Sequence, residues 1–211
     1  MILMQLNINF IIGGEETFAE IESTKSLEIF SNEACEFLNA ISRRLIKVKN
    51  FPDVATFGFW CRKASLAQMA AAYKNLFRIG RGIIFHIAPS NVPVNFAYSF
   101  AAGLLAGNIN IVRVPSKNFP QVPIICEAIK NALNDFPEMT PYIYMVKYGH
   151  EHEINDLFSS ICDTRVIWGG DATINEIRKS PLKVRANEIT FADRHSIAVI
   201  QADKYLQADF Y

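Results

Sequence analysis

Beyond residue 80 the sequence alternates between short β-rich apolar runs and helical patterns, and this alternation restricts the fold more than any other feature. Strands are expected at 82–88, 108–114, 142–148, 164–168, 188–191 and 196–200, and helices at 93–106, 120–134, 151–160 and 171–179. Strands that alternate with helices usually pack as a mostly parallel sheet with helices on both faces. The sequence therefore predicts an α/β fold with a doubly wound sheet.

The first residues have the pattern of a β-hairpin. Apolar and polar residues alternate over 6–10, before Ile11 and Ile12, and the pair Gly13 and Gly14 permits the tight turn of a hairpin. The second strand of this hairpin is expected at 17–21.

Helical spacing follows from Ser26 to Leu45, and Asp53 is expected to cap a further helix that runs towards Phe77. We therefore expect two parts, an N-terminal hairpin and helical segment (1–80) and an α/β domain (81–211).

Composition favours a globular protein that binds small molecules. The 211 residues include 21 lysines and arginines and 21 aspartates and glutamates, so net charge does not indicate a nucleic-acid groove or an anionic membrane surface. The longest apolar run, 93–107, is shorter than the roughly 20 residues that cross a bilayer.

The four cysteines show no CxxC spacing, which suits reduced structural thiols in a cytoplasmic protein. They are Cys35, Cys61, Cys126 and Cys162.

Polar loops follow the first two strands of the expected parallel sheet. The residues at these strand ends are Pro89, Ser90, Asn91, Arg113, Pro115, Ser116 and Lys117. Open α/β sheets bind ligands at the carboxyl ends of their strands. A cation there suits a ribose 2′-phosphate, although Arg113 and Lys117 are equally compatible with a solvated surface pair.

A glycine pair lies between the strand expected at 164–168 and the next helix. The motif G-x-G-x-x-G is absent, but Gly169 and Gly170 would let a pyrophosphate approach backbone N–H groups at a helix start. The alternative is a plain tight turn capped by Asp171, whose carboxylate would compete with a phosphate for those N–H groups.

The histidines give little sign of a metal or a catalytic site. His150 and His152 are two residues apart, which places them on different sides of a helix and makes joint metal binding poor. His86 falls in an expected buried strand and is interpreted as a hydrogen-bonded core residue. His195, close to Asp193, receives no role.

Four segments in order resemble the acyl-CoA reductase family, whose best-known member is the long-chain fatty acyl-CoA reductase of bacterial bioluminescence. They are APSNVPVN, GNINIVRVPSK, RVIWGGDATINEIRKSPLK and EITFADRHSIAVI. The segments SNEACEFLNAISRRL and FPDVATFGFWCRKASL are also similar to this family, so the resemblance covers nearly all of the chain. It implies membership of the aldehyde dehydrogenase superfamily and use of NADPH to reduce a fatty acyl thioester to a fatty aldehyde through an acyl-cysteine.

The resemblance also assigns roles to residues. Asn91 matches the asparagine that donates a hydrogen bond to the thioester oxygen, on which negative charge develops in the transition state. The implied cofactor-binding residues are Pro89, Ser90, Arg113, Pro115, Ser116, Lys117, Gly169 and Gly170. Lys117 stands where NAD-preferring relatives commonly have a glutamate, and a cation there favours the 2′-phosphate of NADPH.

Two departures from the family pattern limit this assignment. Thr190 occupies the position of the usual general-base glutamate, with Glu188 on the same strand face, so no general base is assigned. The family nucleophile falls beyond Tyr211, and none of the four cysteines matches it. We therefore expect a cofactor-binding N-terminal portion of the reductase.

Several interpretations stay open. The main alternative is a non-catalytic nucleotide-binding or interaction remnant, and a third is reduction of an acyl phosphate or a free aldehyde. The resemblance also implies a homo-oligomer at full length and an acyl-transferring or acyl-activating partner enzyme.

Overall fold

The computed structural model describes residues 6–75, 77–149, 151–194 and 197–206. The elements of its first half are β1 (Asn9–Ile12), α1 (Glu15–Ala19), the 3-10 helix η2 (Ile21–Ser23), α2 (Asn32–Leu45), α3 (Pro52–Trp60), α4 (Lys63–Ala71), β2 (Ile83–Ile87) and α5 (Asn95–Leu105). Those of its second half are β3 (Ile109–Arg113), α6 (Gln121–Asp135), η3 (Pro137–Tyr142), β4 (Ile143–Lys147), α7 (His152–Ile161), β5 (Thr164–Trp168), α8 (Asp171–Ile177), β6 (Asn187–Phe191) and α9 (Ala202–Leu206).

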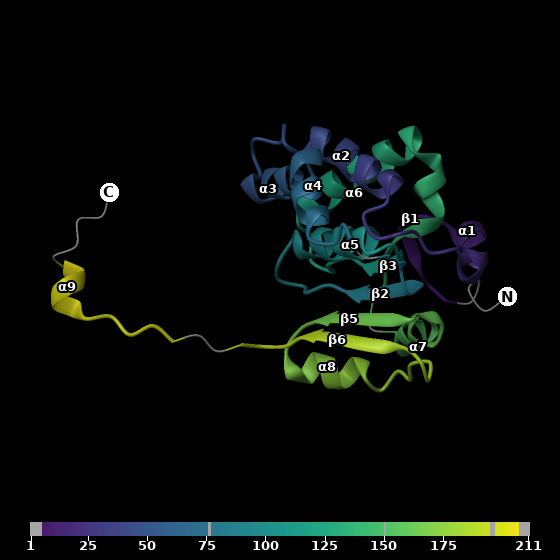
Figure 1. The fold of residues 1–211 in the computed structure, drawn as a ribbon. Coiled ribbons are helices and arrows are strands. Elements are labelled where there is room, and N and C mark those ends of the chain that lie inside the picture. The colour runs from purple at the N-terminus through teal and green to yellow at the C-terminus, as the bar shows by residue number, and fades with distance from the viewer. Residues whose placement is uncertain (1–5, 76, 150, 195–196, 207–211) are drawn as a thin grey trace.

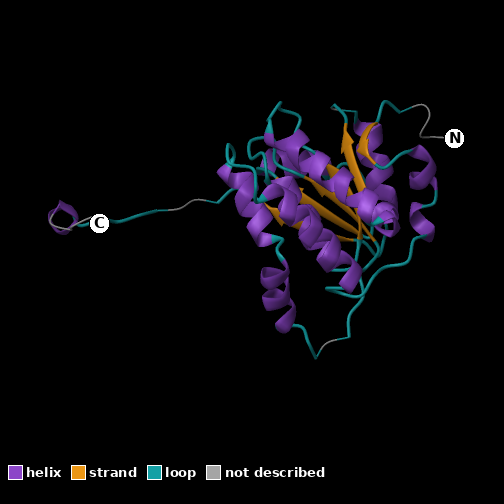
Figure 2. Ribbon diagram, turned by 90° about the horizontal axis from the view of Figure 1, so that it is seen from above, coloured by secondary structure: helices purple, strands orange, loops and turns teal. Residues whose placement is uncertain are grey.

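The strands form one six-stranded sheet in the order β1-β4-β3-β2-β5-β6 (Figure 1). Every neighbouring pair is parallel except β1 and β4, which are antiparallel. Helices cover both faces of the sheet (Figure 2), so the predicted doubly wound α/β fold is confirmed. The chain moves outward from β2 to β4 on one side and then returns to place β5 on the other side of β2.

Two hydrophobic clusters hold these layers together. The first joins α2, α3, α5 and α6 to one face of the sheet, with Phe37, Phe100 and Ile125 fully buried. The second joins α1, α7 and α8 to the other face, with Phe85, Tyr144 and Phe158 at its centre. Strands β2 to β5 are buried on both sides, which explains why most of their residues are apolar.

Helix α5 lies close to the sheet because its facing residues are small. A Cβ on Gly103 would overlap Asn110 Oδ1 and would lie 3.0 Å from His86 Nε2. Ala101 is fully buried, whereas Ala102 faces solvent. Gly107 then ends the helix with a φ of 82°, a conformation that favours glycine, as predicted.

The N-terminal segment differs from the sequence prediction in its pairing. The strand at 17–21 is wrong, because α1 and η2 occupy these residues. Antiparallel pairing of the first strand is confirmed, but its partner is β4. The first residue of β4, Ile143, follows Asn9 by 134 positions in the sequence. Local alternation predicts a strand correctly but does not identify which strand lies beside it.

The helices before the sheet are also shorter than expected. Residues 27–30 are not helical, and α2 begins after Ser31, whose hydroxyl accepts a hydrogen bond from Ala34 N over 3.3 Å. Asp53 is the second residue of α3 rather than its cap, and the predicted single helix is divided into α3 and α4.

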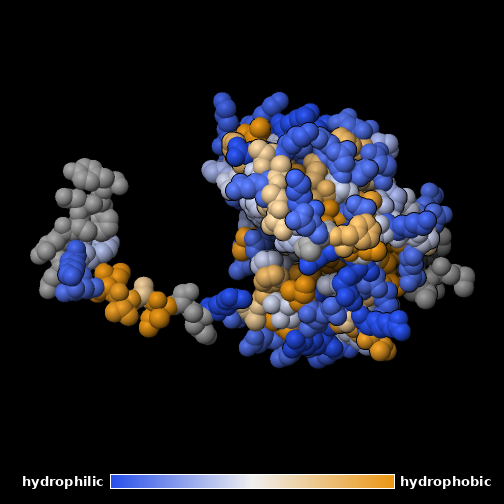
Figure 3. Space-filling view, in the orientation of Figure 1, coloured by the Kyte–Doolittle hydropathy of each residue, from blue (hydrophilic) through white to orange (hydrophobic). Residues whose placement is uncertain are grey.

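The predicted strand at 196–200 is also wrong over its described residues, 197–200, which are in neither strand nor helix. Residues 197–206, here called the C-terminal arm, extend away from the body (Figure 1). Ile197 and Val199 are each 92% exposed, and Figure 3 shows apolar surface along this arm. The apolar side chains therefore have no strand neighbour within the described body.

Among the described residues, no helix has the length and apolar character of a membrane span.

Candidate nucleotide-binding site

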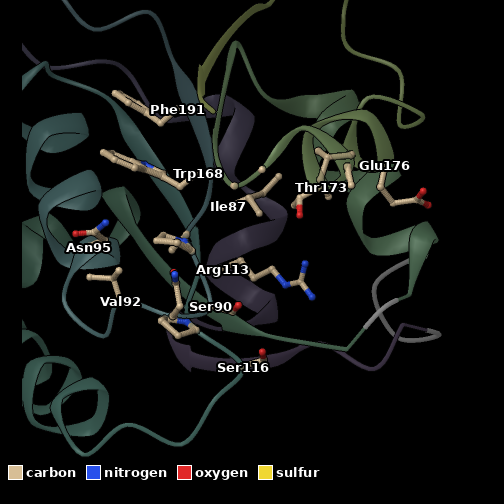
Figure 4. A pocket seen from close by; sticks show the side chains of 18 of the residues that line it. Ile87, Ser90, Val92, Asn95, Arg113, Ser116, Trp168, Thr173, Glu176 and Phe191 are labelled. Carbon is tan, nitrogen blue, oxygen red and sulfur yellow. The ribbon is translucent and has the colours of Figure 1, made fainter. Parts of the chain in front are cut away.

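A cavity of about 920 Å³ opens at the carboxyl ends of β2, β3 and β5 (Figure 4). Ligands in open α/β sheets bind where the strand order reverses, and here β2 sends its next strand to one side while β5 lies on the other. Eight of the nine predicted site residues border this cavity: Pro89, Ser90, Asn91, Arg113, Pro115, Ser116, Gly169 and Gly170.

The loop after β2 contributes Ser90 and Asn91, and both side chains are exposed to the cavity. The loop turns at these residues before α5 begins at Asn95. Neither side chain has a hydrogen-bond partner within the part of the chain that the structure describes. Their polar groups are therefore available to a ligand.

Arg113 is held at the end of β3 by contacts with the next loop. Its guanidinium donates hydrogen bonds to the carbonyls of Gly149 and Tyr148, the latter at 3.5 Å, and lies 4.3 Å from the centre of the Tyr148 ring. Tyr148 is fixed in turn by a hydrogen bond of 2.7 Å from its hydroxyl to Asn155 Oδ1. Figure 4 shows Arg113 extending towards the side of the cavity that Glu176 lines. The cavity thus contains a positioned positive charge.

Lys117 is the one predicted site residue that does not border the large cavity. It is exposed and borders a second cavity, of about 200 Å³, between α6 and the ends of β1, β3 and β4. Lys147 lines the same small cavity, which has no carboxylate among its lining residues. Val114 and Pro115 border both cavities, so the two hollows adjoin at this loop.

Close packing accounts for the two glycines, Gly169 and Gly170, in the turn after β5. A Cβ on Gly170 would overlap the carboxylate of Asp193, and one on Gly169 would lie 3.0 Å from Thr173 Cγ2. Neither glycine has a positive φ. Close packing therefore explains both glycines, and the Asp193 carboxylate places negative charge beside the turn where a pyrophosphate was predicted.

Trp168 and Phe191 form an aromatic wall of the cavity that the sequence prediction did not include. Their rings lie parallel, at an interplanar angle of 8° and a centroid distance of 3.8 Å (Figure 4). The two residues are opposite each other in the parallel β5–β6 register. Each is the last residue of its strand, and this shared position is the signal that could have identified them.

A buried polar chain runs beneath this wall. Trp168 Nε1 donates to Ser99 Oγ over 3.3 Å, Ser99 Oγ lies 2.8 Å from His86 Nδ1, and His86 Nε2 lies 3.1 Å from Asn110 Oδ1. Asn110 Nδ2 donates to Asn108 O over 2.8 Å. Since the Asn110 amide oxygen only accepts, we assign the proton to His86 Nε2, and the Ser99 hydroxyl then donates to Nδ1.

His86 is therefore a satisfied core residue, as predicted, with 2% of its surface exposed. Burial lowers the pKa of its imidazole to about 4, although the hydrogen bond to Asn110 acts in the opposite direction. The ring is neutral at pH 7 and serves as a bridge between helix α5 and strand β3.

The four cysteines are free thiols, and none of them lines the large cavity. Burial raises the pKa of Cys126 to about 12 and that of Cys162 to about 11. Burial also raises the pKa of Cys61 and Cys35, with a further contribution from Glu36 at Cys35. Protonated, buried thiols are poor nucleophiles, which supports the prediction that these cysteines are structural.

Glu188 lies away from the cavity and has a structural role. Its carboxylate accepts hydrogen bonds from Arg165 Nη2 at 2.6 Å and from Arg178 Nε at 2.7 Å. Burial opposes ionisation, but these two arginines lower the pKa of Glu188 below its ordinary value. Thr190 does not border the cavity either, and the carboxylates that do so, among the described residues, are Glu176 and Asp193.

The remaining histidines form no metal site in the described structure. His152 lies 3.2 Å from Asp156 Oδ1 and 3.9 Å from Glu176 Oε1, and it borders the large cavity. No cluster of three or more potential metal ligands occurs among the described residues. His150 and His195 lie outside the described residues.

Solved structures with a similar fold include aldehyde dehydrogenases. Proline utilization A from Corynebacterium freiburgense has a TM-score of 0.60 and 16% identity, over 83% of this chain and 20% of its own. Betaine aldehyde dehydrogenase from Staphylococcus aureus in complex with NAD+ has a TM-score of 0.57 and 15% identity, over 83% of this chain and 39% of its own. The NADP-dependent glyceraldehyde-3-phosphate dehydrogenase from Bacillus halodurans C-125, complexed with NADP, has a TM-score of 0.52 and 17% identity, over 75% and 39%.

At these identities the likeness establishes the fold, which is that of aldehyde dehydrogenases. The chain spans between 20% and 39% of the length of these structures. No curated protein matches the chain.

The sequence itself matches the acyl-CoA reductase (LuxC) family over residues 62–210. The match covers more than half of the chain and includes β2 to β6 together with every loop of the large cavity. The residues that line the large cavity all lie within the part of the chain that matches the family. The chain belongs to the acyl-CoA reductase (LuxC) family.

Proposed function

We propose that this chain forms the NADPH-binding portion of a reductase that converts long-chain fatty acyl-CoA to fatty aldehyde. The observation that carries the proposal is the convergence of three predicted loops, after β2, β3 and β5, on one cavity where the strand order reverses. When bound, the nicotinamide would supply the hydride. In this proposal residues 81–211 are the cofactor domain and residues 1–80 precede it.

The residues of the cavity fit a nicotinamide dinucleotide. Its volume of about 920 Å³ lies within the roughly 300–1,000 Å³ of ligand pockets. Apolar and aromatic walls, from Ile87, Trp168 and Phe191, suit flat rings, and Arg113 suits a phosphate. Two carboxylates at the rim, of Glu176 and Asp193, oppose anion binding and narrow the space that a phosphate can occupy.

Each predicted residue then has a role. Asn91, with its free amide, would donate a hydrogen bond to the thioester oxygen, where charge develops during reduction. Pro89, Ser90, Pro115 and Ser116 would shape the walls around the cofactor, and Arg113 would pair with a phosphate. The backbone at Gly169 and Gly170 would receive the pyrophosphate.

Lys117 would contact the 2′-phosphate from the neighbouring small cavity. The shared border at Val114 and Pro115 lets one ligand reach both hollows. Lys147, on the same small cavity, would add a second positive charge to that contact.

The test is a fluorescence titration of the folded protein with NADPH and NADH. Lys117→Glu should weaken NADPH binding about tenfold or more and change NADH binding little, because the charge acts on the 2′-phosphate alone. Lys130→Glu is the matched control, since Lys130 is exposed on α6 but borders neither cavity. Equal effects on both nucleotides would remove Lys117 from the 2′-phosphate contact. Binding of neither nucleotide by the parent protein would overturn the cofactor assignment.

The alternative function is a non-catalytic nucleotide-binding or interaction module, and it is favoured by the absence of all four cysteines from the cavity lining. Aldehyde formation from acyl-CoA and NADPH separates the two functions. We further propose a cytoplasmic location, a homo-oligomer, and a partner enzyme that transfers or activates the acyl group.

A further inference from the structure

Trp168 and Phe191 combine a fixed geometry with exposure to the cavity. Their stacked rings stand at the ends of β5 and β6, and Phe191 remains 38% exposed although it is a large apolar residue. An aromatic side chain that stays open to a cavity is suited to contact a ligand. Since the two residues are register partners, the sheet places their side chains next to each other.

The plane of the Trp168 ring is fixed from below by the buried polar chain. Its indole N–H is bonded to Ser99, which is 7% exposed, and Ser99 is bonded to His86, which is 2% exposed. The indole N–H of Trp168 only donates and the amide oxygen of Asn110 only accepts, so the direction of the hydrogen bonds between them, through Ser99 and His86, is determined. Rotation of the indole would leave a buried hydroxyl without its donor.

We propose that Trp168 and Phe191 form a stacking surface for a flat heteroaromatic ring in the large cavity, with Ser99 as the residue that positions it. The inference rests on the proposed function, because NADPH carries two such rings, nicotinamide and adenine. Parallel aromatic faces bind flat rings through π-stacking, and this is worth about tenfold in affinity for a base. A flexible acyl chain would not require parallel rings, and we treat it as an outcome of the test.

The first experiment compares the parent protein with Phe191→Leu, which keeps apolar volume but removes the flat face. Calorimetric titrations use nicotinamide mononucleotide, adenosine 2′,5′-bisphosphate and inorganic pyrophosphate, which has no ring. We expect about tenfold weaker binding of one of the two ring ligands and unchanged binding of pyrophosphate. The ligand that is affected identifies the ring. Ile189→Leu is the control, because Ile189 is exposed on the same strand and does not border the cavity.

The second experiment tests Ser99 in a Trp60→Phe background, where Trp168 is the remaining tryptophan of the two in the chain. Trp60 packs against Phe57 and Tyr98 and does not line the cavity. Ser99→Ala should shift the emission of Trp168, because the indole loses its acceptor, and should weaken the ring ligand about threefold while pyrophosphate is unaffected. A purely structural role would lower stability without this selectivity.

The outcomes separate the stacking surface from the proposed function. If each ring ligand binds Phe191→Leu as tightly as it binds the parent protein, and the parent protein binds NADPH, the stacking surface is overturned and the cofactor assignment stands. If Phe191→Leu instead weakens only the binding of a long-chain acyl-CoA, titrated in the same way, the wall belongs to the acyl chain and the inference is wrong. If the parent protein binds no nucleotide at all, both fail together. Unchanged Trp168 emission and ring affinity in Ser99→Ala would remove Ser99 from its positioning role.

Discussion

At the scale of single residues, His86 makes stability depend on pH. Burial lowers the pKa of its imidazole to about 4, against an ordinary value of 6.5, so the unfolded chain takes up this proton before the folded protein does. The free energy of unfolding should therefore fall as pH drops below about 6.5, by about 2 kcal/mol between pH 7 and pH 5 from this group. Urea unfolding at the two pH values measures the loss. His86→Gln should show a smaller difference, and an equal difference would exclude His86 as the cause.

Asp193 allows a second prediction at the residue scale. Its carboxylate contacts the Gly170 turn, where like charge would repel the proposed pyrophosphate. Asp193→Asn should tighten NADPH binding severalfold, measured by fluorescence titration. Asp135→Asn is the control, since Asp135 is exposed at the end of α6 and does not border the cavity. Weaker binding by Asp193→Asn would indicate that the carboxylate accepts a hydrogen bond from the ligand instead.

At the scale of elements, Arg165 ties β5 and β6 to the ends of α7 and α8. Its guanidinium, with a side chain 3% exposed, bonds Ser159 Oγ, the carbonyls of Ile177 and Ser180, and the Glu188 carboxylate. Glu188→Gln removes the negative charge that pairs with the buried Arg165 guanidinium. The free energy of unfolding should therefore fall by about 3 kcal/mol, measured by urea titration. Arg178→Gln removes the exposed partner of the same carboxylate and should cost no more than about 1 kcal/mol. Similar losses in both variants would contradict a buried role for Arg165.

At the scale of the whole molecule, the body and the C-terminal arm should differ in their resistance to proteolysis. The arm extends from the edge of the sheet at β6 (Figure 1), whereas the body has two continuous hydrophobic clusters. Brief trypsin treatment should cleave first after Arg194 or Lys204 and leave the body intact, because cleavage requires accessible backbone. Mass spectrometry identifies the sites, and circular dichroism of the product reports whether the body stays folded. Earlier cleavage within α2 to α6 would contradict this division.

Local sequence patterns were enough to predict strands β2 to β5 and the loops of the site. Strands β2 to β5 and helices α5 to α8 were predicted nearly in place, because a buried strand or amphipathic helix is specified by the spacing of its own apolar residues. The loops that carry Asn91, Arg113 and Gly169 followed from the same boundaries, since parallel strands end at one edge of the sheet.

Which of these parts are neighbours depends on contacts between residues that are distant in the sequence. Strand β1 pairs with β4 rather than with residues 17–21, and Lys117 borders a different cavity from Arg113 although only three residues lie between them. The chain from Trp168 through Ser99 to His86 joins β5, α5 and β2. Such contacts depend on strand order, register and the close approach of α5, which are properties of the complete core. Local spacing carries no information about them. Trp168 and Phe191 each end a predicted strand, but their pairing as an aromatic wall became apparent only in the folded protein.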